Sequence, residues 1–151
     1  MDISLYQKEV LKLNDKLHHH LSHLLRVDFD RYHITDMQFQ ALNYIAYHDG
    51  TTIGDMAKAL GVDAGNMSSL CKKLEHYEYA LRLRGSKDER VVHLHLTRSG
   101  KRCVSDLNEK LKEHYDSQWQ LINDKDKELI LNGLIKLNQF FESFQRKDDK
   151  K

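Results

Sequence analysis

Residues 51–77 read TTIGDMAKALGVDAGNMSSLCKKLEHY, and this stretch decides the fold. Apolar residues recur at helical spacing on both sides of Gly61, and glycine is the residue that ends a helix in a left-handed conformation without steric cost. Thr52, followed by Asp55, is suited to cap the first helix, and Asp63 is suited to cap the second. The pattern predicts two short helices joined by a tight turn, the arrangement of a helix-turn-helix.

The second of these helices has two chemically different sides. One side is apolar and contains Met67, Leu70, Cys71 and Leu74. The other carries small polar residues first and cations later, namely Gly65, Asn66, Ser68, Ser69, Lys72, Lys73 and His76. Short polar side chains suit an approach to base edges in a major groove, while lysines reach phosphates. Because a solvated helix face has a similar composition, this helix alone leaves both interpretations open.

The next segment favours DNA binding. Residues 81–84 (LRLR) and 92–96 (VHLHL) alternate apolar and basic side chains, as half-buried strands do. Between them lies the polar loop 85–90 (GSKDER). Two short strands around a basic loop, directly after a helix-turn-helix, predict a winged helix whose loop reaches a neighbouring minor groove.

The distribution of charge agrees with this interpretation. The chain has 151 residues and a net charge of only +1. Residues 63–102 carry a net charge of +4, whereas residues 103–151 carry −1. The positive charge is therefore concentrated on the part that we expect to bind DNA.

Long amphipathic helices are predicted on both sides of this lobe. One covers about residues 5–26, a second begins at a capping box formed by Thr35 and Gln38, a third begins near residue 99, and a fourth follows a break at residues 123–124. The last helix is apolar on more than one side, and a second subunit is the simplest source of that burial. We therefore expect an obligate dimer in which residues 1–34 and 103–151 form the dimerisation region and residues 35–102 the DNA-binding lobe. The expected fold is mainly α with a small β-hairpin wing.

Several classes of protein are disfavoured by the sequence. No apolar run approaches the roughly 20 residues of a membrane-spanning helix, and the N-terminus lacks the layout of a signal peptide. Two cysteines favour a reducing compartment, so we predict a cytoplasmic protein without membrane contact. The absence of a catalytic constellation predicts that the chain is not an enzyme and has no cofactor.

Four motifs resemble those of the MarR family of bacterial transcriptional regulators. They are residues 35–42 (TDMQFQAL), 74–75 (LE), 88–92 (DERVV) and 96–100 (LTRSG), of which the Asp-x-Arg followed by Leu-Thr-x-x-Gly is the most specific. The resemblance covers nearly the whole chain. It implies a homodimer with interlocking terminal helices on a palindromic site, and repression, or less often activation, relieved by a small ligand, an oxidant or a metal.

The resemblance also implies which residues contact DNA. Arg90 is expected to enter the minor groove, with Asp88 holding the wing, and Thr52 to meet a phosphate. The complete predicted set is Thr52, Asn66, Ser68, Ser69, Lys72, Lys73, Arg84, Lys87, Asp88 and Arg90. Where the family usually has glycine after the recognition helix, this chain has Glu78, which leaves the end of that helix in question.

The sequence gives fewer indications of the effector that the resemblance implies. We expect an effector cavity between the terminal helices and the winged lobe, lined by His20, Arg26, His33, Tyr47 and Trp119. His19 and His23 have the i, i+4 spacing of metal ligands, but no acidic residue or cysteine stands at a matching position, so no metal site is predicted. Two alternatives stay open: a winged-helix protein-interaction module without DNA binding, and a metal- or redox-responsive regulator.

Overall fold

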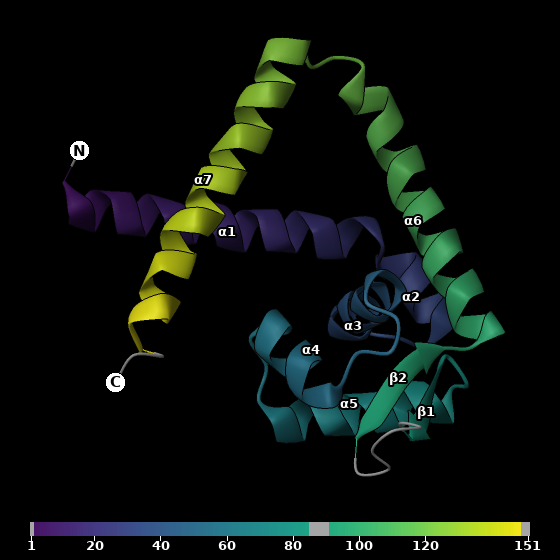
Figure 1. The fold of residues 1–151 in the computed structure, drawn as a ribbon. Coiled ribbons are helices and arrows are strands. Elements are labelled where there is room, and N and C mark those ends of the chain that lie inside the picture. Colours follow the sequence, from purple (N-terminus) through teal and green to yellow (C-terminus); the bar gives the residue numbers. More distant parts are fainter. Residues whose placement is uncertain (1, 85–90, 149–151) are drawn as a thin grey trace. The chain divides into compact units, whose positions relative to one another are not determined.

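The computed structural model describes residues 2–84 and 91–148, which form seven helices and two antiparallel strands (Figure 1). The expectation of a mainly α fold with a small β-hairpin is confirmed. The chain divides into two compact units, Met1–Lys112 and Glu113–Lys151, and the helices that position the candidate site all belong to the first.

The N-terminal region contains two helices, α1 (Ile3–Leu24) and α2 (Arg26–Tyr32), where the sequence predicted one helix over about 5–26. The helical path is interrupted at Leu25, whose φ of −104° and ψ of 5° lie outside the helical region. Leu25 is only 3% exposed and belongs to the core together with Phe29 of α2. The break in the helix therefore coincides with the burial of Leu25. The apolar periodicity of the sequence does not predict this break.

Helix α3 (Asp36–Tyr47) begins with the predicted capping box. The amide of Gln38 donates to Oγ1 of Thr35 over 3.3 Å, and the amide of Thr35 donates to Oε1 of Gln38 over 2.8 Å. Its buried face contains Phe39, Leu42 and Ile45, whereas Ala46 is exposed.

The helix-turn-helix consists of α4 (Ile53–Leu60) and α5 (Ala64–His76), and all three predicted boundary signals are confirmed. Oγ1 of Thr52 accepts from the amide of Asp55 over 3.1 Å. Gly61 has a φ of +64°. The carboxylate of Asp63 accepts from the amide of Gly65 over 2.8 Å, which starts α5.

The wing hairpin pairs β1 (Ala80–Arg84) with β2 (Val92–Leu96), and Ala80 lies opposite Leu96. The loop 85–90 lies outside the described residues. An additional bridge joins Leu94 to Thr51, where the amide of Leu94 donates to the carbonyl of Thr51 over 2.8 Å. This bridge fixes the hairpin against the connection between α3 and α4.

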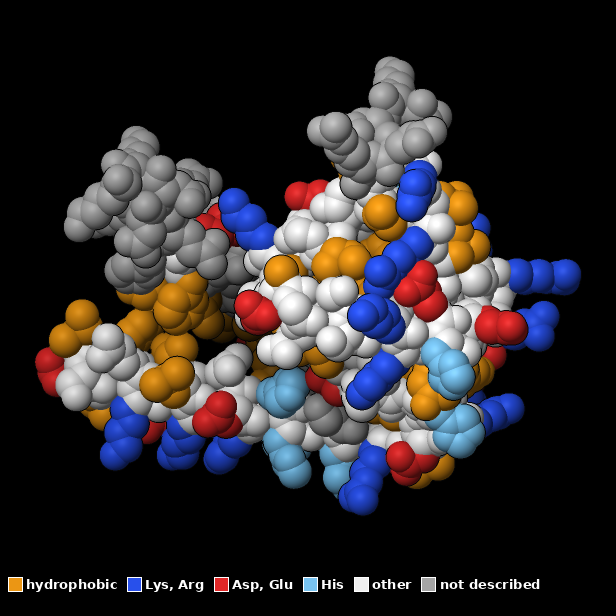
Figure 2. Space-filling view, turned by 90° about the horizontal axis from the view of Figure 1, so that it is seen from below, with side chains coloured by type: hydrophobic (Ala, Val, Ile, Leu, Met, Phe, Trp, Pro, Cys, Tyr) orange, Lys and Arg blue, Asp and Glu red, His pale blue; other side chains and the backbone are white. Residues whose placement is uncertain are grey.

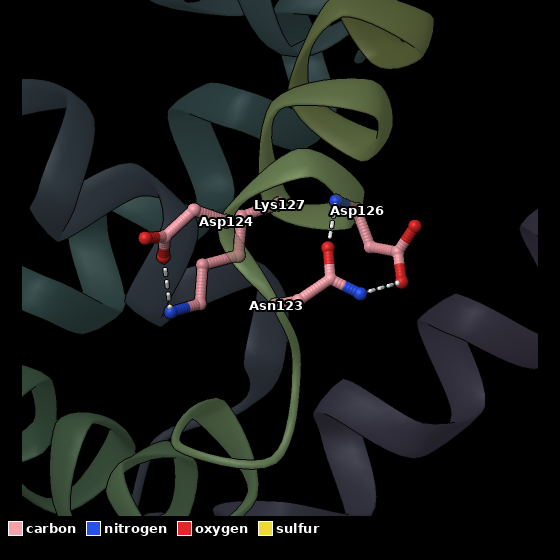
Figure 3. Close-up of polar contacts among 4 residues, drawn as sticks. All are labelled: Asn123, Asp124, Asp126 and Lys127. Carbon is pink, nitrogen blue, oxygen red and sulfur yellow. Dashed lines mark hydrogen bonds and ion pairs between the residues drawn. The ribbon is translucent and has the colours of Figure 1, made fainter.

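The C-terminal region contains α6 (Arg98–Trp119) and α7 (Asp124–Asp148). As predicted, α7 starts after Asn123, whose Oδ1 accepts from the amide of Asp126 over 3.0 Å, while Lys127 donates to Asp124 over 3.1 Å (Figure 3). None of the described side chains between Glu113 and Ser143 is buried. Most of the large apolar residues described in the second unit are thus exposed.

Candidate nucleic-acid interface

Helix α5 presents one buried side and one exposed side. Met67, Cys71 and Leu74 are completely buried. On the other side Ser68 is half-buried, and the exposed residues are Asn66, Ser69, Lys72, Lys73 and His76. Figure 2 views the molecule from below relative to Figure 1 and shows Lys and Arg side chains running across this part of the surface. The predicted residues of α5 are thus brought together on one accessible face.

Two side chains of this face differ in their hydrogen bonding. Asn66 lies in the first turn of α5, and its carboxamide makes no hydrogen bond within the described part of the chain. The hydroxyl of Ser69 instead donates to the carbonyl of Gly65 over 3.1 Å. Asn66 therefore keeps all its donors and acceptors for a ligand, whereas Ser69 keeps its acceptor lone pairs.

The hairpin is attached to α5 by a charge pair that the sequence did not reveal. Nε of Arg82 on β1 lies 2.9 Å from Oε2 of Glu75 on α5, and both side chains are about one-third exposed or less. Nη2 of Arg82 donates to the carbonyl of Ser68 over 3.5 Å. Arg82 thus holds α5 against the hairpin, and this contact engages one of the cations in the positively charged part of the chain.

On β2, two histidines attach the hairpin to the connection between α3 and α4. Nδ1 of His93 lies 2.6 Å from the carbonyl oxygen of Gly50, and Nδ1 of His95 lies 2.9 Å from Oδ1 of Asp49. Alternation along the strand predicts that His93 and His95 lie on the same face of β2. Their partners, Gly50 and Asp49, come close to them only through the fold.

Helix α5 ends regularly although Glu78 occupies the position where glycine is usual. Glu78 adopts a left-handed φ of +58°. Its amide donates to the carbonyl of Glu75, and the amide of Tyr79 donates to the carbonyl of Leu74, both over 2.9 Å. This pair of bonds is a Schellman motif, so the helix ends in the usual way although the position lacks glycine.

The motif Leu-Thr-x-x-Gly at 96–100 packs against this helix end. Thr97 donates its hydroxyl proton to the carbonyl of Glu78 and its amide proton to that of Tyr79, and Oγ1 accepts from the amide of Gly100 over 2.9 Å. A Cβ on Gly100 would lie 1.9 Å from the carbonyl oxygen of Tyr79. Glycine at this position therefore allows α6 to start in direct contact with the end of α5.

The remaining predicted DNA contacts lie in different surroundings. Thr52 is half-buried, and its hydroxyl donates to the carboxylate of Asp55 over 2.7 Å. Arg84 is exposed at the end of β1. Lys87, Asp88 and Arg90 lie outside the described residues.

The residues predicted to line an effector cavity are distributed over several places. Arg26 lines a pocket of about 390 Å³ with His19 and His23, whereas Tyr47 lines another, of about 410 Å³, whose wall includes His18. His20 and His33 are exposed. Trp119 belongs to the second unit, where Nζ of Lys127 lies 5.0 Å from its ring centre.

The two cysteines are buried. Burial raises the pKa of Cys71 to about 11 and that of Cys103 to about 12. Desolvation is the main cause of both shifts, and it outweighs any effect of the helix start on Cys103. The described residues contain no group of three or more His, Cys, Asp or Glu side chains arranged to hold a metal ion.

Comparison with known proteins identifies the family. The model of the transcriptional regulators SarA and Rot matches residues 23–107, which is more than half of the chain. The chain belongs to the SarA/Rot family of transcriptional regulators. A relative of this SarA/Rot-family chain, the HTH-type transcriptional regulator FarR of Neisseria gonorrhoeae, is 26% identical over 102 residues, which are 68% of this chain and 69% of the relative.

Solved structures share the fold of this SarA/Rot-family regulator. A MarR transcriptional regulator from Methanosarcina mazei has a TM-score of 0.80 and 22% identity, over 91% of this chain and 99% of the other. FabT of Streptococcus pneumoniae, solved in complex with DNA, has a TM-score of 0.72 and 23% identity, over 89% and 99%. The MarR-type winged helix inferred from the sequence is thereby confirmed as the fold, and the chain is a transcriptional regulator by family. Within the described residues, no helix has the length and apolarity that crossing a membrane requires.

Proposed function

We propose that this SarA/Rot-family chain acts as a homodimer that binds a palindromic DNA site sequence-specifically, represses nearby genes and responds to a small-molecule effector. The observation that carries the proposal is the exposed face of α5, on which polar side chains at the start of the helix precede Lys72 and Lys73. A helix with this order suits a major groove, because short side chains meet base edges while lysines reach phosphates.

In this proposal the DNA contacts are divided among three elements. Asn66, Ser68 and Ser69 face the bases, while Lys72 and Lys73 contact phosphates. Arg84, Lys87 and Arg90 place the wing in the adjacent minor groove, with Asp88 holding the wing. Because the hydroxyl of Thr52 is engaged with Asp55, the group that Thr52 offers to a phosphate is its backbone amide.

Residues 1–34 and 103–151 form the dimerisation region in this proposal. Support comes from large apolar side chains that the single chain leaves exposed, such as Leu13 and Leu17 on α1 and Ile130, Leu134 and Phe141 on α7. Such a quantity of exposed apolar surface is unusual for a monomer and typical of a subunit interface.

The effector acts in this proposal by a shift in population. Pockets of about 390 and 410 Å³ are large enough for a small organic ligand, and both include residues from α1 or its junction with α2. A ligand that binds one separation of the two winged lobes more tightly favours that separation and changes the fit to half-sites one helical turn apart.

A salt titration of DNA binding tests the proposal. Arg90→Ala is expected to weaken binding to every duplex and to lower the slope of log affinity against log salt by about one phosphate equivalent. Lys125→Ala, on the exposed surface of α7, is the matched control and should leave both quantities unchanged. Filter binding at several salt concentrations measures both.

The same titration also separates the proposal from a protein-interaction module. The exposed face of α5 lacks the aromatic and aliphatic anchors that protein interfaces use. If the unmodified protein binds no duplex DNA in the filter assay even at low salt, DNA binding is excluded. If Arg90→Ala leaves affinity and slope unchanged, the wing assignment is wrong.

A further inference from the structure

Asn66 has the hydrogen-bonding groups that match the major-groove edge of adenine. Its side chain is exposed in the first turn of α5, and its carboxamide is unengaged within the described residues. A carboxamide offers an acceptor and a donor side by side, while adenine offers the N6 amino donor and the N7 acceptor. Guanine offers two acceptors, N7 and O6, so one of them would face the carboxamide oxygen.

Ser69 has a narrower preference, because its hydroxyl proton is already engaged. The bond of 3.1 Å to the carbonyl of Gly65 leaves only lone pairs facing outward. Lone pairs accept from the amino group of adenine or cytosine and are repelled by the O6 of guanine and the O4 of thymine.

The spacing of the two residues matches neighbouring base pairs. Three residues along an α-helix correspond to a rise of about 4.5 Å. Base pairs are separated by about 3.4 Å. Lys73 lies a further turn along, at about 6 Å from Ser69, where its long side chain reaches a phosphate.

We infer that α5 reads two neighbouring base pairs in each half-site, an adenine through Asn66 and an amino-bearing base, adenine or cytosine, through Ser69. This inference rests on the proposed function, since it assumes that α5 enters a major groove. It adds the base sequence that the helix selects.

Selection from a pool of randomised duplexes tests the inference with the full chain. The unmodified protein should enrich one adenine in each half-site, next to a position occupied by adenine or cytosine. Asn66→Ala should reduce the preference for that adenine by about tenfold or more. Asn66→Asp should shift it towards cytosine, because a carboxylate only accepts. Ser69→Ala should relax only the neighbouring position, and Lys125→Ala should select the unmodified motif.

A modified base provides a readout that does not depend on any variant. Replacing the selected adenine by 7-deazaadenine removes the N7 acceptor and keeps Watson–Crick pairing. The unmodified protein should then lose affinity by about tenfold, whereas the same replacement outside the motif should have no effect.

The outcomes distinguish this inference from the proposed function. If the unmodified protein enriches no duplex, the proposed function fails and the inference fails with it. If it enriches a motif that Asn66→Ala also enriches unchanged, or if 7-deazaadenine leaves its affinity unaltered at every motif position, DNA binding stands and reading by Asn66 is excluded.

Discussion

Glu78 holds a backbone conformation that suits glycine better. Its φ is +58°, and a residue with a Cβ in this region costs about 1 kcal/mol relative to glycine. Glu78→Gly is therefore expected to stabilise the folded chain by up to about 1 kcal/mol, less the entropy that glycine adds to the unfolded state. Urea unfolding monitored by circular dichroism measures this.

Gly61 provides the reverse control for that substitution. Its φ is +64°, and nothing lies within 4 Å of the position of an added Cβ, so Gly61→Ala tests conformation without a steric clash. We expect a loss of about 1 kcal/mol. Equal and unchanged midpoints for both variants would show that neither helix end is limited by its left-handed residue.

The two cysteines make stability depend on alkaline pH. The pKa values of Cys71 and Cys103 are raised by burial to about 11 and 12, from an ordinary value of 9.0. Between pH 9 and 11 the thiols of the unfolded chain ionise while those of the folded chain remain neutral. The thiols' contribution to stability is thus fully present below about pH 9 and is lost as pH rises towards 11–12.

Urea midpoints measured from pH 8 to pH 10.5 test this dependence. The midpoint should be nearly constant up to pH 9 and fall above it. The double variant Cys71→Ala, Cys103→Ala, although less stable throughout, should show a shallower fall. A fall of the same steepness in both proteins would assign the alkaline loss to other groups, such as Tyr32, whose pKa is raised to about 12 by its hydrogen bond to Asp106.

The contact between the end of α5 and the start of α6 depends on Gly100. A Cβ there would lie 1.9 Å from the carbonyl oxygen of Tyr79, so the two elements would have to move apart. Gly100→Ala is expected to destabilise the chain by about 3 kcal/mol or more. Thermal and urea unfolding measure the loss.

Gly133 is the matched control for Gly100, because it lies within α7 and an added Cβ would meet nothing within 4 Å. Gly133→Ala should raise helix stability by about 0.5–1 kcal/mol. Destabilisation by both variants would indicate a general intolerance of alanine, and the specific role of the contact with Tyr79 would be refuted.

The elements that the sequence predicted best are those defined by local signals. The caps at Thr35, Thr52 and Asp63 and the turn at Gly61 each depend on residues within four positions of one another, and all were correct. The break at Leu25 accompanies packing into a distant core, so periodicity alone predicted one continuous helix. The α5 end at Glu78 was in question because the position lacks glycine, and the local Schellman bonds are supplemented there by a bond from Thr97, nineteen residues away.

Across the whole chain, the residues of the candidate site could be predicted from the sequence, whereas the contacts that hold these residues in place could not. The exposed face of α5 follows from helical spacing, which is a property of the sequence. The pair between Glu75 and Arg82 joins a helix to a strand and follows from the fold alone. The pockets are also products of tertiary packing, which is why Arg26 and Tyr47, grouped in the sequence prediction, line different ones.

The proposed dimerisation can be tested at the exposed apolar residues of α7. Ile130, Leu134 and Phe141 recur at helical spacing on α7, and Leu134 is 50% exposed in the single chain. If this row is buried between two copies, Leu134→Lys places a charge in that interface and should raise the dimer dissociation constant by at least about 100-fold. Analytical ultracentrifugation measures the constant directly.

Asn132→Lys introduces the same charge at a polar position of α7 and should leave the dimer intact. A monomer with a single recognition helix cannot occupy both halves of a palindrome, so Leu134→Lys should also lose specific binding while retaining weak, salt-sensitive binding to any duplex. Loss of the dimer together with unchanged specific affinity would mean that one winged lobe suffices. An unchanged dissociation constant would instead place the interface away from this row of α7.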